Sequence, residues 1–440
     1  MASKNRIREN KPSTQPAAQY SPKVATSQGE EKSKPISIQA RRVRTVCMIV
    51  FIGLVCSLLF HNYQASLPEK DVYPYNTFLF KQTDRFNDFN NIYTASADLN
   101  PFSSSVSVYF PFTYIITYLF TKMDQSIALG LFLMSFVAFY VYYLYKNLPL
   151  SESFQKIIAI VILSAMSYPF LFLVDRANLE AWGFISIASF LYFYVKKQDF
   201  PAVICLAIAT SFKLYPALFA VLFLIDRKYL MALYTGLIAG VLALGSAAIL
   251  KGGIAGSIAG QKKCLEIFNQ VYLNGSSHGM QHSSSFFVPL KLFYYNILAT
   301  SGNYPANYEN FFNNNYFLVA IVLFLPILFV LLRYQLPLWK KVALMVSTFI
   351  LLPQISYDYK LISLMIPVVL YFQAEEQGKF DKYYAILFGL LLIPKDYYII
   401  TIDLSISSIL TPIILLVLMI LLVVETVKES PKLNWSNNGA

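Results

Sequence analysis

The sequence predicts an all-α polytopic membrane protein, built as a bundle of about 12 transmembrane helices with two larger extracytoplasmic loops. Of its 440 residues, 56% are hydrophobic and only 13% are charged, whereas soluble domains carry about a quarter charged residues. Apolar runs recur along almost the whole chain after residue 44. A helix suits each run because it satisfies its own backbone hydrogen bonds without water. A transmembrane barrel would instead show alternating segments of about ten residues, and the sequence has none.

The basic residues predict how the chain is oriented in the membrane. The net charge is +11, and Lys and Arg concentrate in the N-terminal tail and in short loops, which is the positive-inside pattern. This distribution places both termini in the cytoplasm and argues against nucleic-acid binding. Arg41, Arg42 and Arg44 directly precede the first apolar run, 45–60. A cleaved secretory signal is the alternative, but the long preceding tail favours an uncleaved anchor.

The chain divides into three regions. Residues 1–43 are expected to form a disordered basic cytoplasmic tail because they are too polar to bury a core. Residues 44–427 would be membrane-embedded, with outer loops at 61–105 and 251–314, and 428–440 would form a second cytoplasmic tail. The predicted spans are 45–60, 124–145, 157–174, 178–195, 199–212, 214–225, 229–250, 315–333, 342–353, 359–373, 383–394 and 404–425.

Two segments do not read as ordinary spans. The run 199–225 is long enough for one tilted helix, but one helix would put its two basic ends on opposite sides of the membrane. We therefore predict two short helices, broken near Lys213 and Pro216. The segment 107–121, "SVYFPFTYIITYLFT", is expected to be interfacial or re-entrant. It would be a true span if one of the other turns were misplaced.

The predicted topology gathers many ionisable residues on the outer side. Charge at the membrane edge or at bilayer depth is costly and therefore indicates function, although each charge could also cap a helix or extend to the headgroups. The outer set is Asp84, Asp88, Asp98, Asp175, Arg176, Glu180, Lys213, His278, His282, Asp358, Lys360, Lys395 and Asp396.

Asp88 is the candidate catalytic residue. It lies early in the aromatic, amide-rich segment "RFNDFNNIYTASADLNPF", where a carboxylate could act as general base toward a sugar hydroxyl. Asp84 is four residues earlier, so on a helix the two carboxylates would share a face. Such a pair could raise one pKa by like-charge repulsion or bind a metal. The alternative is that Asp88 caps a helix or pairs with Arg85.

Further candidates lie where one apolar helix ends and another begins. In "LVDRANLEAW", Arg176 could hold an anion beside Asp175 and Asn178, although Asp175 could also cap the second helix. In "ATSFKLYPALF", Lys213 and Tyr215 lie at the predicted outer turn, where a lysine suits a lipid-linked phosphate.

The second outer loop and the last helices supply the remaining candidates. His278 and His282 are four residues apart, but a zinc site would need a third ligand and no HExxH motif is present. We therefore expect them to contact a sugar or phosphate, and we expect no metal. Asp358 and Lys360 lie at the outer end of a predicted helix and are assigned to substrate binding.

Several common motifs are absent. The sequence has no Walker loop, no GxGxxG after a strand, no GxSxG and no CxxC pair. No cofactor is therefore expected, and an enzyme of this kind would take an activated donor from the lipid phase. The four cysteines do not form a disulfide framework, since three of them lie within apolar segments.

The order of these elements resembles the C-type (GT-C) glycosyltransferase superfamily, and most closely glycosyltransferase family 87. "DFNNIYTASADLNPF" resembles the family's stretch that runs from an acid to Asn-Pro-Tyr, and "YFPFTYII" resembles its Tyr-Pro-Pro element. "SFKLYPALF" matches its Lys-x-x-Pro element, and "QHSSSFFVPL" is similar to its Asn-Gln-Ser-Leu stretch. "DRANLEAW" resembles its Gly-Gln-x-Asn helix start, where Asn178 matches and Asp175 and Arg176 depart. The resemblance covers about 61–365.

The resemblance implies a GT-C-like bundle and an inverting mannosyltransferase that uses a polyprenyl-phosphate sugar. The acceptor would be a glycolipid or cell-envelope glycan on the outer side of the cell membrane, among membrane lipid. Asp88 would be the base, Arg176 and Lys213 would stabilise the leaving phosphate, and His278 or His282 would contact donor phosphate or acceptor.

Two other classes remain as alternatives. A transporter or flippase of lipid-linked sugars would show pseudo-symmetric halves, whereas the predicted loops are asymmetric. A surface-polysaccharide polymerase or ligase would rely on Arg and His in its large outer loop instead of an acid after the first span.

Overall fold

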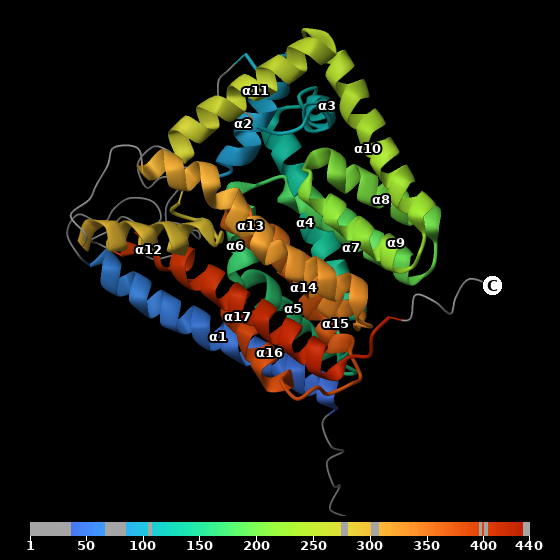
Figure 1. Cartoon of the computed structure of the whole chain (residues 1–440), viewed down its shortest axis with the longest axis vertical. Helices are drawn as coiled ribbons and strands as arrows, with labels where there is room; N and C mark the ends of the chain where they lie inside the picture. Colours follow the sequence, from blue (N-terminus) through green and yellow to red (C-terminus); the bar gives the residue numbers. More distant parts are fainter. Residues whose placement is uncertain are drawn as a thin grey trace, which may run out of the picture. The chain divides into compact units, whose positions relative to one another are not determined.

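The computed structural model describes residues 37–66, 85–103, 108–273, 280–300, 308–395, 398–399 and 404–433. Two of the predicted site residues, Asp84 and His278, lie outside these ranges. The elements, labelled in Figure 1, are α1 (Ile38–Ala65), α2 (Asn87–Ser96), α3 (Pro111–Phe120), α4 (Gln125–Asn147), α5 (Ser153–Ala165), α6 (Tyr168–Arg176), α7 (Glu180–Val195), α8 (Asp199–Phe212), η1 (Tyr215–Phe219), α9 (Ala220–Ile225), α10 (Tyr229–Ile249), α11 (Gly253–Tyr272), α12 (Phe287–Thr300), α13 (Tyr308–Arg333), α14 (Leu338–Leu351), η3 (Asp358–Leu364), α15 (Met365–Gln373), α16 (Asp381–Leu392), β1 (Tyr398–Ile399), β2 (Leu404–Ser405) and α17 (Ile406–Glu429).

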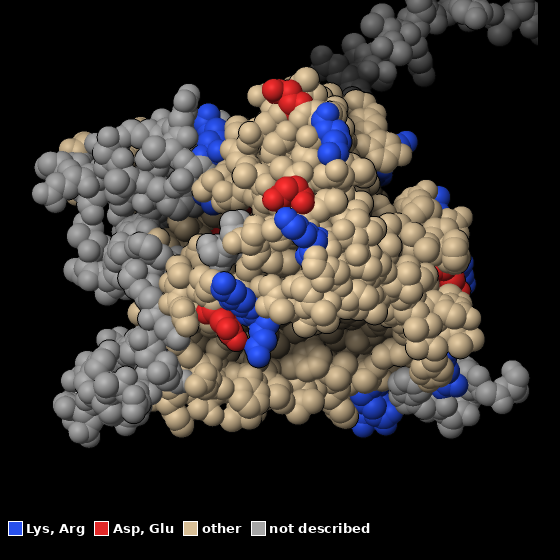
Figure 2. All heavy atoms as spheres, turned by 90° about the horizontal axis from the view of Figure 1, so that it is seen from above, with Lys and Arg blue, Asp and Glu red and all other residues tan. Residues whose placement is uncertain are grey.

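The long helices confirm the prediction of a helical, multi-pass membrane protein. Within the described ranges, α1, α4, α10, α13 and α17 each contain a stretch long and apolar enough to cross a bilayer, and α5 with α6 could form a sixth span. At most 44% of each such window is buried inside the protein, so most of each window faces outward. On the face shown in Figure 2, most of the described surface is uncharged, and the charged side chains lie in small groups. The remaining predicted spans correspond to shorter helices in the described part of the chain, so the expected number of twelve spans is not confirmed.

The helices add detail to two of the segments predicted from the sequence. The predicted span 157–174 is two helices, α5 and α6, bent by 54°, because Pro169 lies in the first turn of α6 and cannot donate to the preceding turn. The predicted outer loop 251–314 contains α11, α12 and the start of α13. No long apolar run marks α11, but it packs closely on the first outer segment: a methyl group at Gly260 would come within 2.5 Å of Phe102.

The predicted break in 199–225 is present. α8 ends at Phe212, Lys213 is extended, and Pro216 lies in the first turn of η1. Lys228 Nζ lies 2.6 Å from Asp199 Oδ1, so the two ends of the segment meet and the helices form a hairpin. α3 has ten residues and is about 15 Å long, too short to cross alone, as expected for 107–121.

α14 is the central helix of the described bundle. Every residue from Val342 to Leu351 is buried, and the helix packs against α15, α17, η1 and η3. A second part of the core is aromatic and joins α4, α6 and α7 through Phe136, Phe170 and Phe184. This packing holds the end of α6 and the start of α7 in place, and Asn178, one of the predicted site residues, lies between those two ends.

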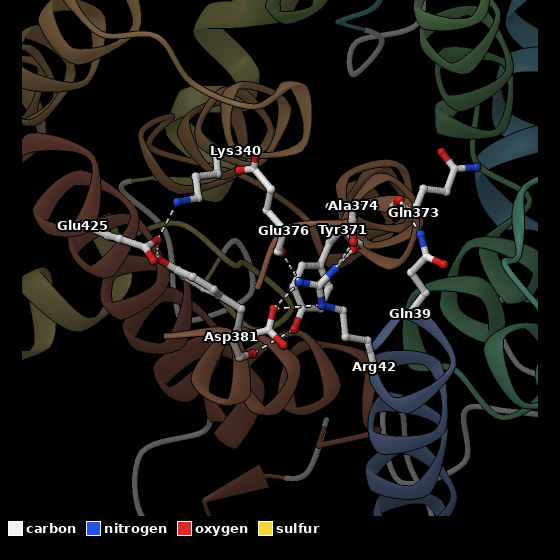
Figure 3. A network of polar contacts seen from close by, with 10 residues as sticks. Gln39, Arg42, Lys340, Tyr371, Gln373, Ala374, Glu376, Asp381 and Glu425 are labelled. Atoms are coloured by element: carbon white, nitrogen blue, oxygen red, sulfur yellow. Dashed lines mark hydrogen bonds and ion pairs between the residues drawn. The ribbon is translucent and has the colours of Figure 1, made fainter. Parts of the chain in front are cut away.

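A buried polar network joins α1 to α15 and α16 (Figure 3). α1 begins at Ile38, so part of the predicted tail, Ile38 to Val43, is helical. Arg42 is only 3% exposed; its Nε donates to Asp381 at 2.8 Å, and its Nη atoms donate to the carbonyls of Tyr371, Ala374 and Glu376. These carbonyls lie at and beyond the end of α15, where the helix leaves acceptors without partners. Arg42 therefore ties the first helix to the end of α15.

Candidate active site

Asp88 is held in place by two donors from the link between α6 and α7. Its Oδ1 accepts a hydrogen bond from Arg176 Nη2 at 2.8 Å, and its Oδ2 accepts one from Asn178 Nδ2 at 2.7 Å. The backbone N–H of Phe86, a residue in the left-handed conformation, donates to the carbonyl of Asp175 at 2.7 Å. The start of α2 is thereby fixed to the end of α6. The Asp88 and Arg176 side chains are 16% and 17% exposed, so the carboxylate stays accessible.

Asn178 connects this carboxylate to α7. Asn178 is fully buried, and its Oδ1 accepts from the backbone N–H of Glu180 at 3.0 Å. Its Nδ2 also donates to the Tyr109 hydroxyl at 3.3 Å. Burial, and secondly the charge of Asp88, raise the pKa of Tyr109 well above its usual value. The Tyr109 phenol therefore stays protonated at neutral pH and can donate a hydrogen bond.

A second ionic pair lies next to the first. Lys213 Nζ lies 2.6 Å from Glu180 Oε1, and the Tyr215 hydroxyl donates to Glu180 Oε2. The same ammonium lies 5.2 Å from the ring centroids of Tyr109 and Tyr359, within the range of cation–π attraction. Tyr109 thus touches both ionic pairs and joins them into one site.

Lys360 completes the cluster from η3. Its Nζ lies 5.3 Å from the ring centroid of Tyr215, and that ring packs on Phe349 at 4.3 Å. Phe349 belongs to α14, so the central helix supports the tyrosine that lies between the lysine and Glu180.

The structure brings together many of the residues singled out in the sequence. Asp88, Arg176, Asn178, Lys213, Tyr215 and Lys360 converge. Asp175 contributes its carbonyl to the Phe86 contact. His282 is buried, and its ring lies 5.6 Å from that of Phe172, which in turn packs on Tyr359 at 6.4 Å.

Asp358, which we expected to bind substrate, is fully buried. Its carboxylate accepts hydrogen bonds from the hydroxyls of Tyr168 at 2.6 Å, Ser407 at 2.8 Å and Ser284. Its backbone N–H donates to the carbonyl of His282 at 2.8 Å. These contacts join α6, α17, η3 and the segment before α12. The geometry therefore favours a structural role for this carboxylate.

Three contributors were not assigned roles from the sequence. Tyr109 and Tyr359 belong to a large set of tyrosines, 32 in all, and nothing local distinguishes them. Glu180 was noted among the outer charges, but its pairing with Lys213 spans 33 positions and depends on how α7 packs against α8. Among the residues that the structure describes, no group of three His, Cys, Asp or Glu could hold a metal ion.

Comparison with known protein families places the chain beside a glycosyltransferase family. The model of glycosyltransferase family 87 matches residues 108–353, which is more than half of the chain. The matched region includes Tyr109, Arg176, Asn178, Glu180 and Lys213, whereas Asp88 precedes it. No curated protein and no solved structure matches the chain.

Proposed function

The chain belongs to glycosyltransferase family 87 and is a membrane glycosyltransferase, and from that premise we propose its donor, acceptor and catalytic base. The donor is a polyprenyl-phosphate sugar, with mannose as the sugar. The acceptor is a glycolipid or cell-envelope glycan on the outer side of the membrane. The observation that carries the proposal is the placement of Asp88, oriented by Arg176 and Asn178 beside a lysine cluster.

Asp88 is the general base in this proposal. An ionised carboxylate has about four lone-pair positions, and Arg176 and Asn178 use two of them. An acceptor hydroxyl can therefore approach the partly exposed side and transfer its proton to Asp88. The acceptor oxygen forms a bond to the anomeric carbon while the bond from that carbon to the phosphate oxygen breaks. Attack opposite the phosphate inverts the configuration, and polyprenyl phosphate leaves.

The lysines form the phosphate side of the site. Negative charge grows on the phosphate oxygen as the bond to the sugar breaks, and fixed cations stabilise it. Lys213 and Lys360 lie close to each other around Tyr215, and the Tyr109 hydroxyl is a neutral donor next to them. Arg176, which we expected to bind the phosphate, contacts Asp88, so we assign it to orienting the base.

The charge distribution supports an extracytoplasmic site. Arg42, Lys228 and Lys340 belong to the basic segments that the positive-inside rule places in the cytoplasm. Lys340 stands at the start of α14, whereas Phe349, which supports Tyr215, stands near its end. The candidate site therefore lies at the other end of the central helix from these basic segments.

Family membership favours a glycosyltransferase over a flippase or a polysaccharide polymerase. Consumption of the lipid-linked sugar donor distinguishes these three classes. Purified protein would be given polyprenyl-phosphate mannose and a lipid extract as acceptor. A transferase releases polyprenyl phosphate and forms a mannosylated lipid, whereas a flippase leaves the donor intact. A polymerase or ligase would instead join preassembled glycan chains.

The variant Asp88→Asn tests the base directly. We expect it to abolish transfer while the protein still inserts and folds. Asp98→Asn is the matched control, because Asp98 lies in the same outer segment and accepts only a local hydrogen bond from Asn100 among the described residues. Transfer at the wild-type rate by Asp88→Asn would remove this residue from the mechanism.

A further inference from the structure

The Glu180–Lys213 pair is open to solvent on one side only. The side chain of Glu180 is 0% exposed, and that of Lys213 is 21% exposed. Glu180 therefore contacts the ammonium from the protein interior, and the accessible side belongs to the lysine. An anion that enters the site meets Lys213 first and finds it already paired with a buried carboxylate.

Tyr215 connects Glu180 to a second lysine, Lys360. The Tyr215 hydroxyl donates to Glu180, and the face of its ring lies 5.3 Å from Lys360 Nζ. Lys360 is within electrostatic reach of both Glu180 and Lys213, and in the described part of the chain it forms no ion pair of its own. One buried carboxylate is thus the counter-charge of two lysines.

We propose that Glu180 is a positioning residue that limits how tightly these lysines hold the donor phosphate, so that the polyprenyl phosphate product can leave. The inference rests on the proposed function, because it concerns the same phosphate. A phosphate held by Lys213 would lie about 5 Å from the Glu180 carboxylate, since one ammonium would contact both groups. Two like charges at that distance repel strongly where little water screens them. After transfer, renewed pairing of Glu180 with Lys213 favours release of the product.

The variant Glu180→Gln removes this charge and preserves the shape of the side chain. Its amide oxygen can still accept from Lys213, and its amide nitrogen can donate to the Tyr215 hydroxyl. The probe is a polyprenyl monophosphate without sugar, tested both as a ligand and as an inhibitor of transfer. The uncharged polyprenol is the reference lipid. We expect Glu180→Gln to bind the monophosphate about tenfold more tightly and to bind the polyprenol as the wild type does.

Steady-state kinetics supply a second readout. If product release limits turnover in Glu180→Gln, kcat and the KM for the donor should fall together. A purely structural defect would lower kcat, or the amount of folded protein, without lowering KM or tightening binding of the monophosphate.

The chain contains a matched control at the other end of α14 (Figure 3). Glu425 is buried, and its Oε2 accepts from Lys340 Nζ and from the Tyr384 hydroxyl, each at 2.6 Å. Glu425→Gln therefore removes the same charge from the same kind of partners. Because Lys340 stands at the opposite end of α14 from Phe349, this variant should bind the monophosphate as the wild type does.

The outcomes separate the two proposals. If the wild type binds the monophosphate no better than the polyprenol, the proposed donor is wrong and the role of Glu180 falls with it. If the wild type prefers the monophosphate but Glu180→Gln binds it equally or more weakly, only the inference about Glu180 is overturned. Should Glu180→Gln fail to fold, the double variant Glu180→Gln with Lys360→Gln restores the charge balance. It is then compared with Lys360→Gln alone and must bind the monophosphate more tightly.

Discussion

Asn178 joins the candidate base to the fold, and the variant Asn178→Ala tests that connection. Its side chain donates to Asp88 at 2.7 Å and accepts from the backbone N–H of Glu180 at 3.0 Å. A hydrogen bond to a charged group contributes about 1.5–3 kcal/mol, and one to a neutral backbone N–H contributes about 1 kcal/mol. Because Asn178 is fully buried, both contacts are lost without easy replacement by water. We expect the free energy of unfolding to fall by about 3 kcal/mol.

The effect on transfer should be partial. Asp88 keeps its contact with Arg176, so in Asn178→Ala the carboxylate keeps one of its two donors but is less well oriented. If the hydrogen bond from Asn178 to Asp88 stabilises the transition state by its full energy, its loss lowers kcat/KM about 10- to 150-fold. Asp88→Asn, which removes the base itself, should be far more severe.

The assay compares kcat/KM for the lipid donor with the thermal midpoint of the same purified sample. Asn147→Ala is the control, since its side chain donates to the Tyr143 carbonyl at 2.8 Å and accepts from Gln373 at 3.2 Å, away from the candidate site. That variant should transfer sugar at the wild-type rate. Wild-type kcat/KM in Asn178→Ala, measured on folded protein, would refute the link between this amide and the base.

Two further predictions concern stability without catalysis. Arg42→Met leaves Asp381 without its buried partner, so the free energy of unfolding should fall by about 3–5 kcal/mol. A thermal melt should show a lower midpoint, while kcat per folded molecule stays unchanged. An unshifted midpoint would contradict the conclusion that Arg42 ties the first helix to the end of α15. Tyr168→Phe removes one of the donors to Asp358 and should cost about 1.5–3 kcal/mol. Its melting curve checks the cost, and a marked change in donor KM with an unshifted midpoint would instead favour a substrate contact for Asp358.

Local features of the sequence were enough to predict several elements. The turn near Lys213 and Pro216 was predicted because proline and a deep charge both disfavour a continuous helix. The helices within the predicted loop 251–314 were not foreseen for the corresponding reason: α11 contains several glycines and two lysines, so it shows no long apolar run. The bend between α5 and α6 was missed because Pro169 lies inside a run that contains no charged residue and is mostly apolar.

In the candidate site, too, some features could be predicted from local sequence and others could not. Arg176, Asn178 and Lys213 could be picked out because each is a polar residue at the edge of an apolar segment, and Asp88 because it lies in an aromatic, amide-rich loop segment. Their partners could not be predicted, because 88 positions separate Asp88 from Arg176. The role of Asp358 was likewise hidden, since its three hydroxyl donors come from distant segments.

The sequence by itself determined that this protein is a helical membrane protein, because transfer of apolar runs into lipid is a property of each segment alone. Only the tertiary structure decided that Asp88 pairs with Arg176 and Asn178, that Glu180 pairs with Lys213, and that Asp358 is buried among hydroxyls. A buried charge takes whichever partner the packing of helices brings within hydrogen-bonding distance, and that packing depends on contacts between segments far apart in the chain.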